Sequence, residues 1–112
     1  MKAAFITETG PADTLQIGEL PDPTPGPGQV VIRVYASAIN PIDTYIRNGT
    51  IAMELPQPFV PGCDAAGVVE SVGPGVKRLS IGDRVWCTNQ GLLGRQGTLS
   101  ELIAVDEHWT FK

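Results

Sequence analysis

Apolar and polar side chains alternate most clearly along residues 29–40, "QVVIRVYASAIN". One set of alternate positions holds Val30, Ile32, Val34, Ala36 and Ala38, and the other holds Val31, Arg33, Tyr35, Ser37 and Ile39. A period of two is typical of a β-strand, because successive side chains of a strand point to opposite faces. This segment is therefore predicted to form one long strand.

Shorter apolar stretches recur along the rest of the chain. They predict further strands over residues 2–7, 15–20, 66–73, 83–87, 98–105 and 108–111. Between them lie two proline-rich loops, 21–28 and 53–62, and a turn-rich segment, 73–83. The 13 glycines and 10 prolines are spaced as they are in chains of many short strands. The pattern predicts a mainly β domain that forms a partly open barrel.

One segment has the pattern of a short helix, "NPIDTYIRNG" at residues 40–49. Asn40 suits the cap position before a helix, and Pro41 suits the first helical position. Gly49 is expected to end the helix after one or two turns. The barrel is thus predicted to carry one or two short helical turns after its longest strand.

Composition limits the classes of function. The 112 residues, 42% of them hydrophobic, are enough for one small domain, and the formal net charge of −4 comes without a basic cluster. A nucleic-acid partner or an anionic membrane would require a basic patch, so neither is expected. No apolar run approaches the roughly 18–20 residues of a membrane span. With two cysteines and no pattern of a secreted disulfide framework, the expected compartment is a reducing cytoplasm.

Most known catalytic and cofactor-binding motifs are absent from this sequence. Gly73-Pro74-Gly75 is followed by Arg78 rather than by the remaining glycine of a dinucleotide-binding turn, and no helix follows it. The single histidine, His108, would have to meet Cys63 or Cys87 by chance to form a nucleophile–base pair. Two cysteines 24 residues apart lack the close spacing of structural zinc ligands.

Three longer motifs occur in a specific order: "INPIDTYIRNGT", "PFVPGCDAAGVVESVGPGVKRLSIGDRVW" and "GTLSELIAV". This combination resembles the GroES-like domain of the medium-chain dehydrogenase/reductase superfamily, in its quinone oxidoreductase (zeta-crystallin-like) branch. The resemblance covers nearly the whole chain. It implies that residues 1–112 are the incomplete catalytic domain of a two-domain enzyme. A Rossmann cofactor domain and a C-terminal completing segment would lie outside them, and the full protein would be a homodimer.

The resemblance also bears on metal binding. Zinc-dependent relatives resemble this chain but carry a cysteine near Asn40, a histidine at position 63 and a glutamate at position 64, together with a four-cysteine lobe. Here those two positions are Cys63 and Asp64, and the loop after residue 86 holds only Cys87. An amide such as that of Asn40 is a poor zinc ligand compared with a thiolate. A metal-free site is therefore expected.

The same resemblance implies roles for residues around the predicted helix. In the quinone oxidoreductase relatives, residues that match Asn40 and Tyr45 line the pocket beside the nicotinamide, and both side chains can donate hydrogen bonds. From the residues alone, Asn40 also suits a helix cap and Tyr45 a half-buried core position. Asp43 is expected to orient Asn40 or a backbone amide. Arg47 either faces solvent or reaches a cofactor phosphate, so Asn40, Tyr45 and Arg47 are the candidate cofactor contacts.

The two residues in the turn before the predicted strand 66–73 complete the candidate site. Asp64 is expected to accept hydrogen bonds from backbone amides of the turn. Cys63 is expected to be a small thiol that lines the pocket. For both residues, the place in the candidate site is what the resemblance implies, and the expected chemistry is that of the side chain itself.

The predicted function is that of the N-terminal domain of an NADPH-dependent, zinc-independent oxidoreductase. It would reduce quinones or α,β-unsaturated carbonyls by hydride transfer, and the isolated chain would be inactive. Two alternatives remain open: a zinc-type alcohol dehydrogenase with altered ligands, and a stand-alone GroES-like binding module.

Overall fold

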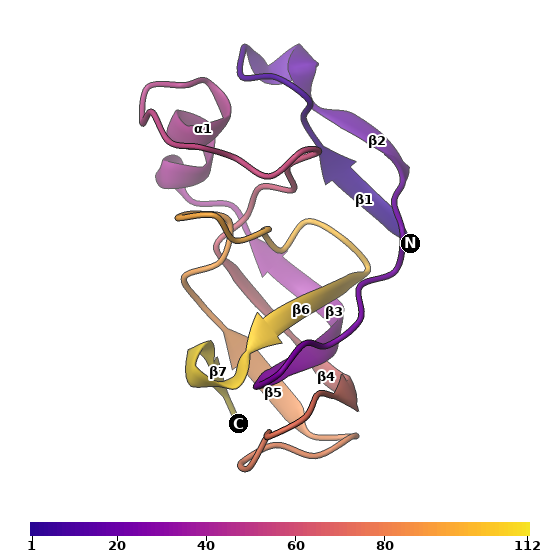
Figure 1. The fold of residues 1–112 in the computed structure, drawn as a ribbon. Helices are drawn as coiled ribbons and strands as arrows, with labels where there is room; N and C mark the ends of the chain where they lie inside the picture. Colours follow the sequence, from indigo (N-terminus) through magenta and orange to yellow (C-terminus); the bar gives the residue numbers. More distant parts are fainter.

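Seven short strands and one α-helix form the fold of residues 1–112 in the computed structural model, all of which the structure describes (Figure 1). The strands are β1 (Lys2–Phe5), β2 (Gln16–Glu19), β3 (Gln29–Ala38), β4 (Asp64–Val72), β5 (Arg84–Cys87), β6 (Leu102–Asp106) and β7 (Thr110–Phe111). The helical elements are α1 (Pro41–Arg47) and two 3₁₀ turns, η1 (Ala12–Thr14) and η2 (Glu107–Trp109). The predicted mainly β class is confirmed.

Two antiparallel sheets are present. The larger has the strand order β6-β3-β4-β5-β7, and the smaller pairs β1 with β2. Figure 1 shows β1, β2 and α1 at one end of the molecule and the larger sheet at the other. The backbone of β1 also joins the segment before β6, because the N–H of Ala4 donates to the carbonyl of Leu99 at 2.9 Å. The two sheets are thereby connected.

The longest predicted strand is confirmed as β3. The predicted uninterrupted alternation of its side chains between two faces is not. Val30, Val31 and Ile32 are all buried, whereas Ala36 and Ala38 are exposed. The register of β3 against β4 shifts between Val31 and Ile32 and again after Val34. An extra residue at such a bulge changes which face the following side chains occupy. A strict period of two therefore misassigns part of this strand.

Two hydrophobic clusters hold the elements together. The larger joins strands of the five-stranded sheet with the segment between β4 and β5, and contains Val30, Ile32, Ala65, Val69, Leu79, Val85, Cys87, Ile103 and Val105. The smaller contains Ile6, Ile46 and Phe59. Ile6 and Phe59 also exchange two backbone hydrogen bonds of 2.9 Å. Since Ile46 belongs to α1, the smaller cluster fixes the helix against Ile6, which directly follows β1, and against the proline-rich loop.

Helix α1 begins and ends where the sequence predicts. Asn40 has extended backbone angles at the cap position, and Pro41 is the first helical residue. Beyond the last turn, Gly49 has φ +85°, the left-handed conformation that commonly ends helices. The helix has seven residues, and no helix in the structure is of the length and apolarity needed to cross a membrane.

The last two predicted strands are only partly correct. β6 begins at Leu102, and the segment before it joins β1 only through an isolated bridge between Ala3 and Ser100. The residues predicted as a strand at 108–111 begin instead inside η2. The Asp106 carboxylate accepts a hydrogen bond from the His108 N–H at 2.8 Å. Such an aspartate favours a turn over an extended chain, so only Thr110 and Phe111 form β7.

Gly67 provides a test of how closely β3 and β4 pack. A Cβ atom at this position would overlap the carbonyl oxygen of Arg33 and would lie 2.9 Å from Cγ2 of Ile32. Gly67→Ala is expected to lower the free energy of unfolding by about 1–3 kcal/mol, because the strands would have to separate. Urea denaturation measures this change. Ala66→Ser, at the exposed neighbouring position, should change stability by less than about 0.5 kcal/mol, and equal effects for the two variants would contradict this packing.

Candidate active site

Three segments that are distant in the sequence meet at one end of the larger sheet. In the β3–β4 register Ala38 faces Asp64, and in the β4–β5 register Ala65 faces Cys87. Asn40 comes two residues after Ala38, and Thr88 directly follows Cys87. The antiparallel pairing therefore brings Asn40, Asp64 and Thr88 to the same end of neighbouring strands.

The Asp64 carboxylate links these segments through both of its oxygens. The side-chain amide Nδ2 of Asn40 donates to Oδ2 of Asp64 at 2.8 Å. The hydroxyl of Thr88 donates to Oδ1 at 2.7 Å. The predicted bonds from turn backbone amides to Asp64 are thus replaced by bonds from two side chains. Hydrogen bonds to an ionised carboxylate are stronger than those between neutral groups, so the Asn40 amide is held in a defined orientation.

Asp43 holds the backbone of Asn40, as the sequence suggests. Its carboxylate accepts a hydrogen bond from the Asn40 N–H at 2.8 Å, and its own N–H donates to the Asn40 carbonyl at 3.0 Å. The residue is only 5% exposed. Burial raises the pKa of the Asp43 carboxyl, the Asn40 N–H lowers it in part, and the nearby charge of Asp64 raises it further. Asp43 is therefore a buried carboxyl at the first turn of α1.

The turn that carries Cys63 and Asp64 is anchored by the segment leading to β6. The buried Thr98 donates its hydroxyl to the Asp64 carbonyl at 3.1 Å and its N–H to the Gly62 carbonyl at 3.1 Å. Gly62 has φ +112°, and a Cβ atom there would overlap the Thr98 hydroxyl. Glycine is required here by both the backbone angle and the close approach. On the other side, Gln90 N–H donates to the Cys63 carbonyl at 3.1 Å.

The two cysteines are free thiols in different surroundings. Cys63 is half-buried, and burial raises its pKa, with a smaller opposing effect from the backbone N–H of Asn89. Cys87 is fully buried in the larger cluster, and burial raises its pKa to about 12. Because the thiolate is the reactive form, neither position favours a nucleophile at neutral pH.

Tyr45 and Arg47 lie further along α1. Tyr45 is 48% exposed, so its ring is accessible to a ligand and does not occupy the core. Arg47 Nε donates to the Gly10 carbonyl at 3.2 Å, and the Gly10 N–H donates to the Arg47 carbonyl at 3.0 Å. Arg47 therefore fastens the helix to the loop after β1.

Sequence reasoning missed Thr88, Thr98 and Gln90. Thr98 is fully buried and Gln90 is 3% exposed, and Gln90 Nε2 donates to the Thr88 carbonyl at 2.9 Å. The one usable signal was positional, since Thr88 directly follows a predicted strand. Its partner, Asp64 on the neighbouring strand β4, depends on the register between strands, which the sequence does not specify.

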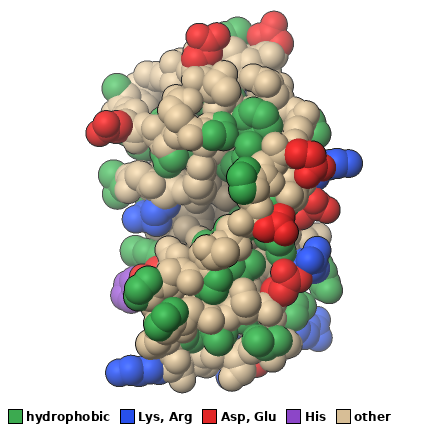
Figure 2. Space-filling model, turned by 45° about the vertical axis from the view of Figure 1, so that its right-hand side comes forward, with side chains coloured by type: hydrophobic (Ala, Val, Ile, Leu, Met, Phe, Trp, Pro, Cys, Tyr) green, Lys and Arg blue, Asp and Glu red, His purple; other side chains and the backbone are tan.

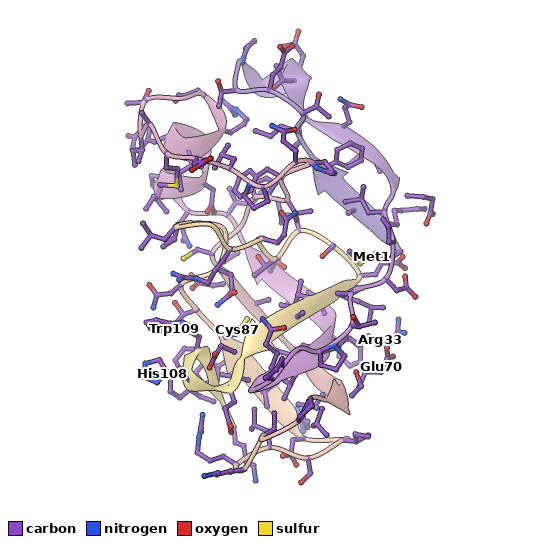
Figure 3. The ribbon with its side chains drawn as sticks, in the orientation of Figure 1. Met1, Arg33, Glu70, Cys87, His108 and Trp109 are labelled. Carbon is purple, nitrogen blue, oxygen red and sulfur yellow. The ribbon has the colours of Figure 1, made fainter.

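No group of three or more histidine, cysteine, aspartate or glutamate side chains lies close enough together to hold a metal ion. His108 packs edge-on against Trp109, with ring centroids 4.7 Å apart. Both residues belong to η2, as Figure 3 shows, while Cys87 lies within the sheet. The histidine therefore belongs to the β7 end of the molecule.

A cavity of about 620 Å³ lies elsewhere, between the start of the chain and β6. Leu20, Val60, Leu102 and Trp109 are among its lining residues, and none of the predicted site residues is. Figure 2 shows a hollow in the middle of one face with hydrophobic side chains around it. None of Asn40, Asp64 and Thr88 lines the cavity, but Gln90, which donates to the Thr88 carbonyl, does.

Comparison with known proteins places this geometry in a family. Residues 26–112 match the model of the alcohol dehydrogenase GroES-like domain. A quinone oxidoreductase of Rattus norvegicus is 42% identical over 88 residues, or 78% of this chain and 27% of that protein. A quinone oxidoreductase of Lama guanicoe is 35% identical over 113 residues, or 100% of this chain and 33% of that protein. A mycobacterial protein solved in complex with NADPH is 38% identical, with a TM-score of 0.87 over 100% of this chain and 32% of its own.

The chain belongs to the alcohol dehydrogenase GroES-like domain family, whose model covers most of its length. Its relatives include quinone oxidoreductases of the medium-chain dehydrogenase/reductase superfamily, so the resemblance seen in the sequence motifs is confirmed. The chain spans about a third of the length of the curated relatives it matches.

The burial of Asp43 predicts a dependence of stability on pH. Its raised pKa means that the folded chain retains a proton where the unfolded chain, with the ordinary value of 3.8, has lost it. The contribution of Asp43 to stability therefore falls as pH rises from about 4 through the raised pKa. Asp43→Asn keeps an oxygen for the Asn40 N–H and cannot ionise. Urea denaturation between pH 4 and 7 should show wild type losing stability relative to Asp43→Asn as pH rises.

The control for this comparison is Asp13→Asn, which changes an exposed carboxylate in η1. Its pH profile should stay close to that of wild type. A constant difference between wild type and Asp43→Asn over the whole range would show that burial does not set the pKa of Asp43.

The two thiols should differ in reactivity. A pKa of about 12 instead of 9.0 lowers the thiolate fraction of Cys87 roughly a thousandfold at neutral pH. Iodoacetamide should therefore modify Cys63 slowly in the folded chain and Cys87 only after denaturation, as followed by mass spectrometry. Cys63→Ser is the control, and it should leave no thiol that reacts in the folded state. Modification of Cys87 at the rate of Cys63 would contradict its burial.

Proposed function

We propose that this chain forms one wall of the active site of an NADPH-dependent, zinc-independent reductase of quinones or α,β-unsaturated carbonyls. The observation that carries the proposal is the fixed orientation of the Asn40 amide in a chain related to quinone oxidoreductases. The Rossmann cofactor domain and a completing segment belong to the rest of the protein in this proposal. The residues described here alone would not catalyse the reaction.

In this proposal, Asn40 and Tyr45 bind the carbonyl oxygen of the substrate. A side-chain amide has two N–H bonds, and Asp64 accepts one from Asn40. The second N–H is left to donate to a ligand. The Tyr45 hydroxyl, on an accessible ring one helical turn further along, is the second donor. Donors held in place before the reaction stabilise charge that develops on oxygen without the cost of reorienting.

NADPH, when bound, supplies the hydride. This chain's residues orient the carbonyl and provide the hydrogen bonds. Arg47 is a candidate contact to the cofactor through the part of its guanidinium group that Gly10 does not occupy. Cytoplasmic location and a homodimeric full-length protein complete the proposal.

The chemistry of the side chains that could bind a metal supports a zinc-independent site. Zinc favours thiolate and imidazole ligands. Here the Cys63 thiol has a raised pKa, and both oxygens of Asp64 already accept hydrogen bonds. The alternative is a zinc-type alcohol dehydrogenase with altered ligands. Elemental analysis of the full-length protein separates the two, because one zinc per chain would support the alternative.

Removing the donors should impair reduction in the full-length protein. Asn40→Ala is expected to lower kcat/KM for a quinone on the order of a hundredfold, because a fixed hydrogen-bond donor to the developing oxyanion is lost. Tyr45→Phe keeps the ring and removes the hydroxyl, and it should lower kcat/KM about tenfold. Steady-state oxidation of NADPH, followed with a panel of quinones and enones, measures both effects.

The matched control is Asn48→Ala, which removes an exposed amide at the end of the same helix. It should leave kcat/KM close to the wild-type value. Equal activity of Asn40→Ala and Asn48→Ala would refute the role proposed for Asn40, and a wild-type protein that reduces none of the compounds would refute the proposed function itself.

A further inference from the structure

The Asn40 side chain could rotate freely if only its backbone were held. Asparagine at a helix start is exposed on one side, and the terminal torsion of its amide is broad. Asp43 forms hydrogen bonds with the backbone N–H and the backbone carbonyl of Asn40. The orientation of the amide group must therefore come from another contact.

That contact is a two-bond bridge across β4. Oδ2 of Asp64 accepts from Asn40 Nδ2 at 2.8 Å, and Oδ1 accepts from the Thr88 hydroxyl at 2.7 Å. With both oxygens engaged, the carboxylate plane cannot turn without breaking one bond. The carboxylate is itself placed by a rigid backbone, since Asp64 C=O accepts from the buried Thr98.

We infer that Asp64 and Thr88 are positioning residues that select one rotamer of the Asn40 amide. Their bridge occupies one N–H of Asn40 and leaves the other N–H for a ligand. Neither residue needs to contact the substrate. The catalytic part of this inference rests on the proposed function, whereas the geometric part concerns the chain alone.

Substitutions at position 64 separate orientation from charge. Asp64→Ala removes the acceptor for both donors. Asp64→Asn can still accept from Asn40 through its oxygen and can donate through its amide to the Thr88 hydroxyl, which accepts as well as it donates. If Asp64 acts by orientation, the asparagine variant retains most of the function that the alanine variant loses. Thr88→Val keeps the shape of the side chain and frees the carboxylate to turn, so it should cause a smaller loss.

The geometric part is tested by NMR of the ¹⁵N-labelled 112-residue chain. The chain has three asparagines, so the Asn40 side-chain signals are assigned by comparison with Asn40→Ala. One Asn40 amide proton should be shifted downfield relative to those of the exposed Asn48. In Asp64→Ala this shift should vanish, and exchange with solvent should become about tenfold faster, as expected for the loss of one hydrogen bond.

The catalytic part is tested in the full-length enzyme. Asp64→Ala should lower kcat on the order of tenfold to a hundredfold with the KM for NADPH unchanged, because a misplaced donor costs transition-state stabilisation. Asp64→Asn should recover most of that loss. Adding Asp64→Ala to Asn40→Ala should cause no further loss, because Asp64 acts through Asn40.

Glu70→Ala is the control for both measurements. Glu70 lies further along β4 than Asp64 and pairs with Arg33 at 2.7 Å (Figure 3). The Glu70→Ala variant should change neither the Asn40 side-chain NMR signals nor kcat.

The outcomes distinguish this inference from the proposed function. An Asn40 proton that is unshifted in wild type, or unchanged in Asp64→Ala, overturns the bridge whatever the activity of the enzyme. A bridge seen by NMR together with normal kcat in Asp64→Ala, or additive losses in the double variant, overturns the positioning role. A full-length wild type without reductase activity overturns the proposed function and the catalytic part with it, while the NMR result still decides the geometric part.

Discussion

The antiparallel pairing of β3, β4 and β5 is the constraint on which the rest of the structure depends. This pairing brings the end of β3, the start of β4 and the end of β5 to the same end of the sheet. The larger core cluster is built from residues of these strands and of β6, together with Leu79 of the segment between β4 and β5. The same backbone hydrogen bonds thus support the hydrophobic core and place Asn40, Asp64 and Thr88 together.

Asn40 shows how one residue serves both the fold and the candidate site. Its backbone occupies the cap position of α1 and is held by Asp43, while its side chain turns to Asp64. The two interactions use different atoms, so they do not compete. A helix start at a strand end is a suitable place for an active-site donor, because the backbone is rigid and the side chain is partly accessible.

The two cysteines show how the surroundings of a thiol affect its reactivity. Cys87 belongs to the core, and Cys63 lies in the turn beside the candidate site, where burial keeps the thiol protonated. In neither place does the thiol resemble the activated thiolate of a nucleophile or of a metal ligand. Polarisation of a substrate in this site therefore depends on hydrogen-bond donors in the proposed reaction.

The sequence by itself determined the strand-rich class, the long third strand, the start and end of α1 and the role of Asp43 beside Asn40. These features depend on residues close together in the chain: alternation, proline at the first helical position, and glycine just beyond the end of the helix. It did not determine the bulges of β3 or the two partners of Asp64. Only the tertiary structure decided these. Strand register and side-chain competition for hydrogen bonds arise between segments 24 or more residues apart, and no local pattern encodes such pairings.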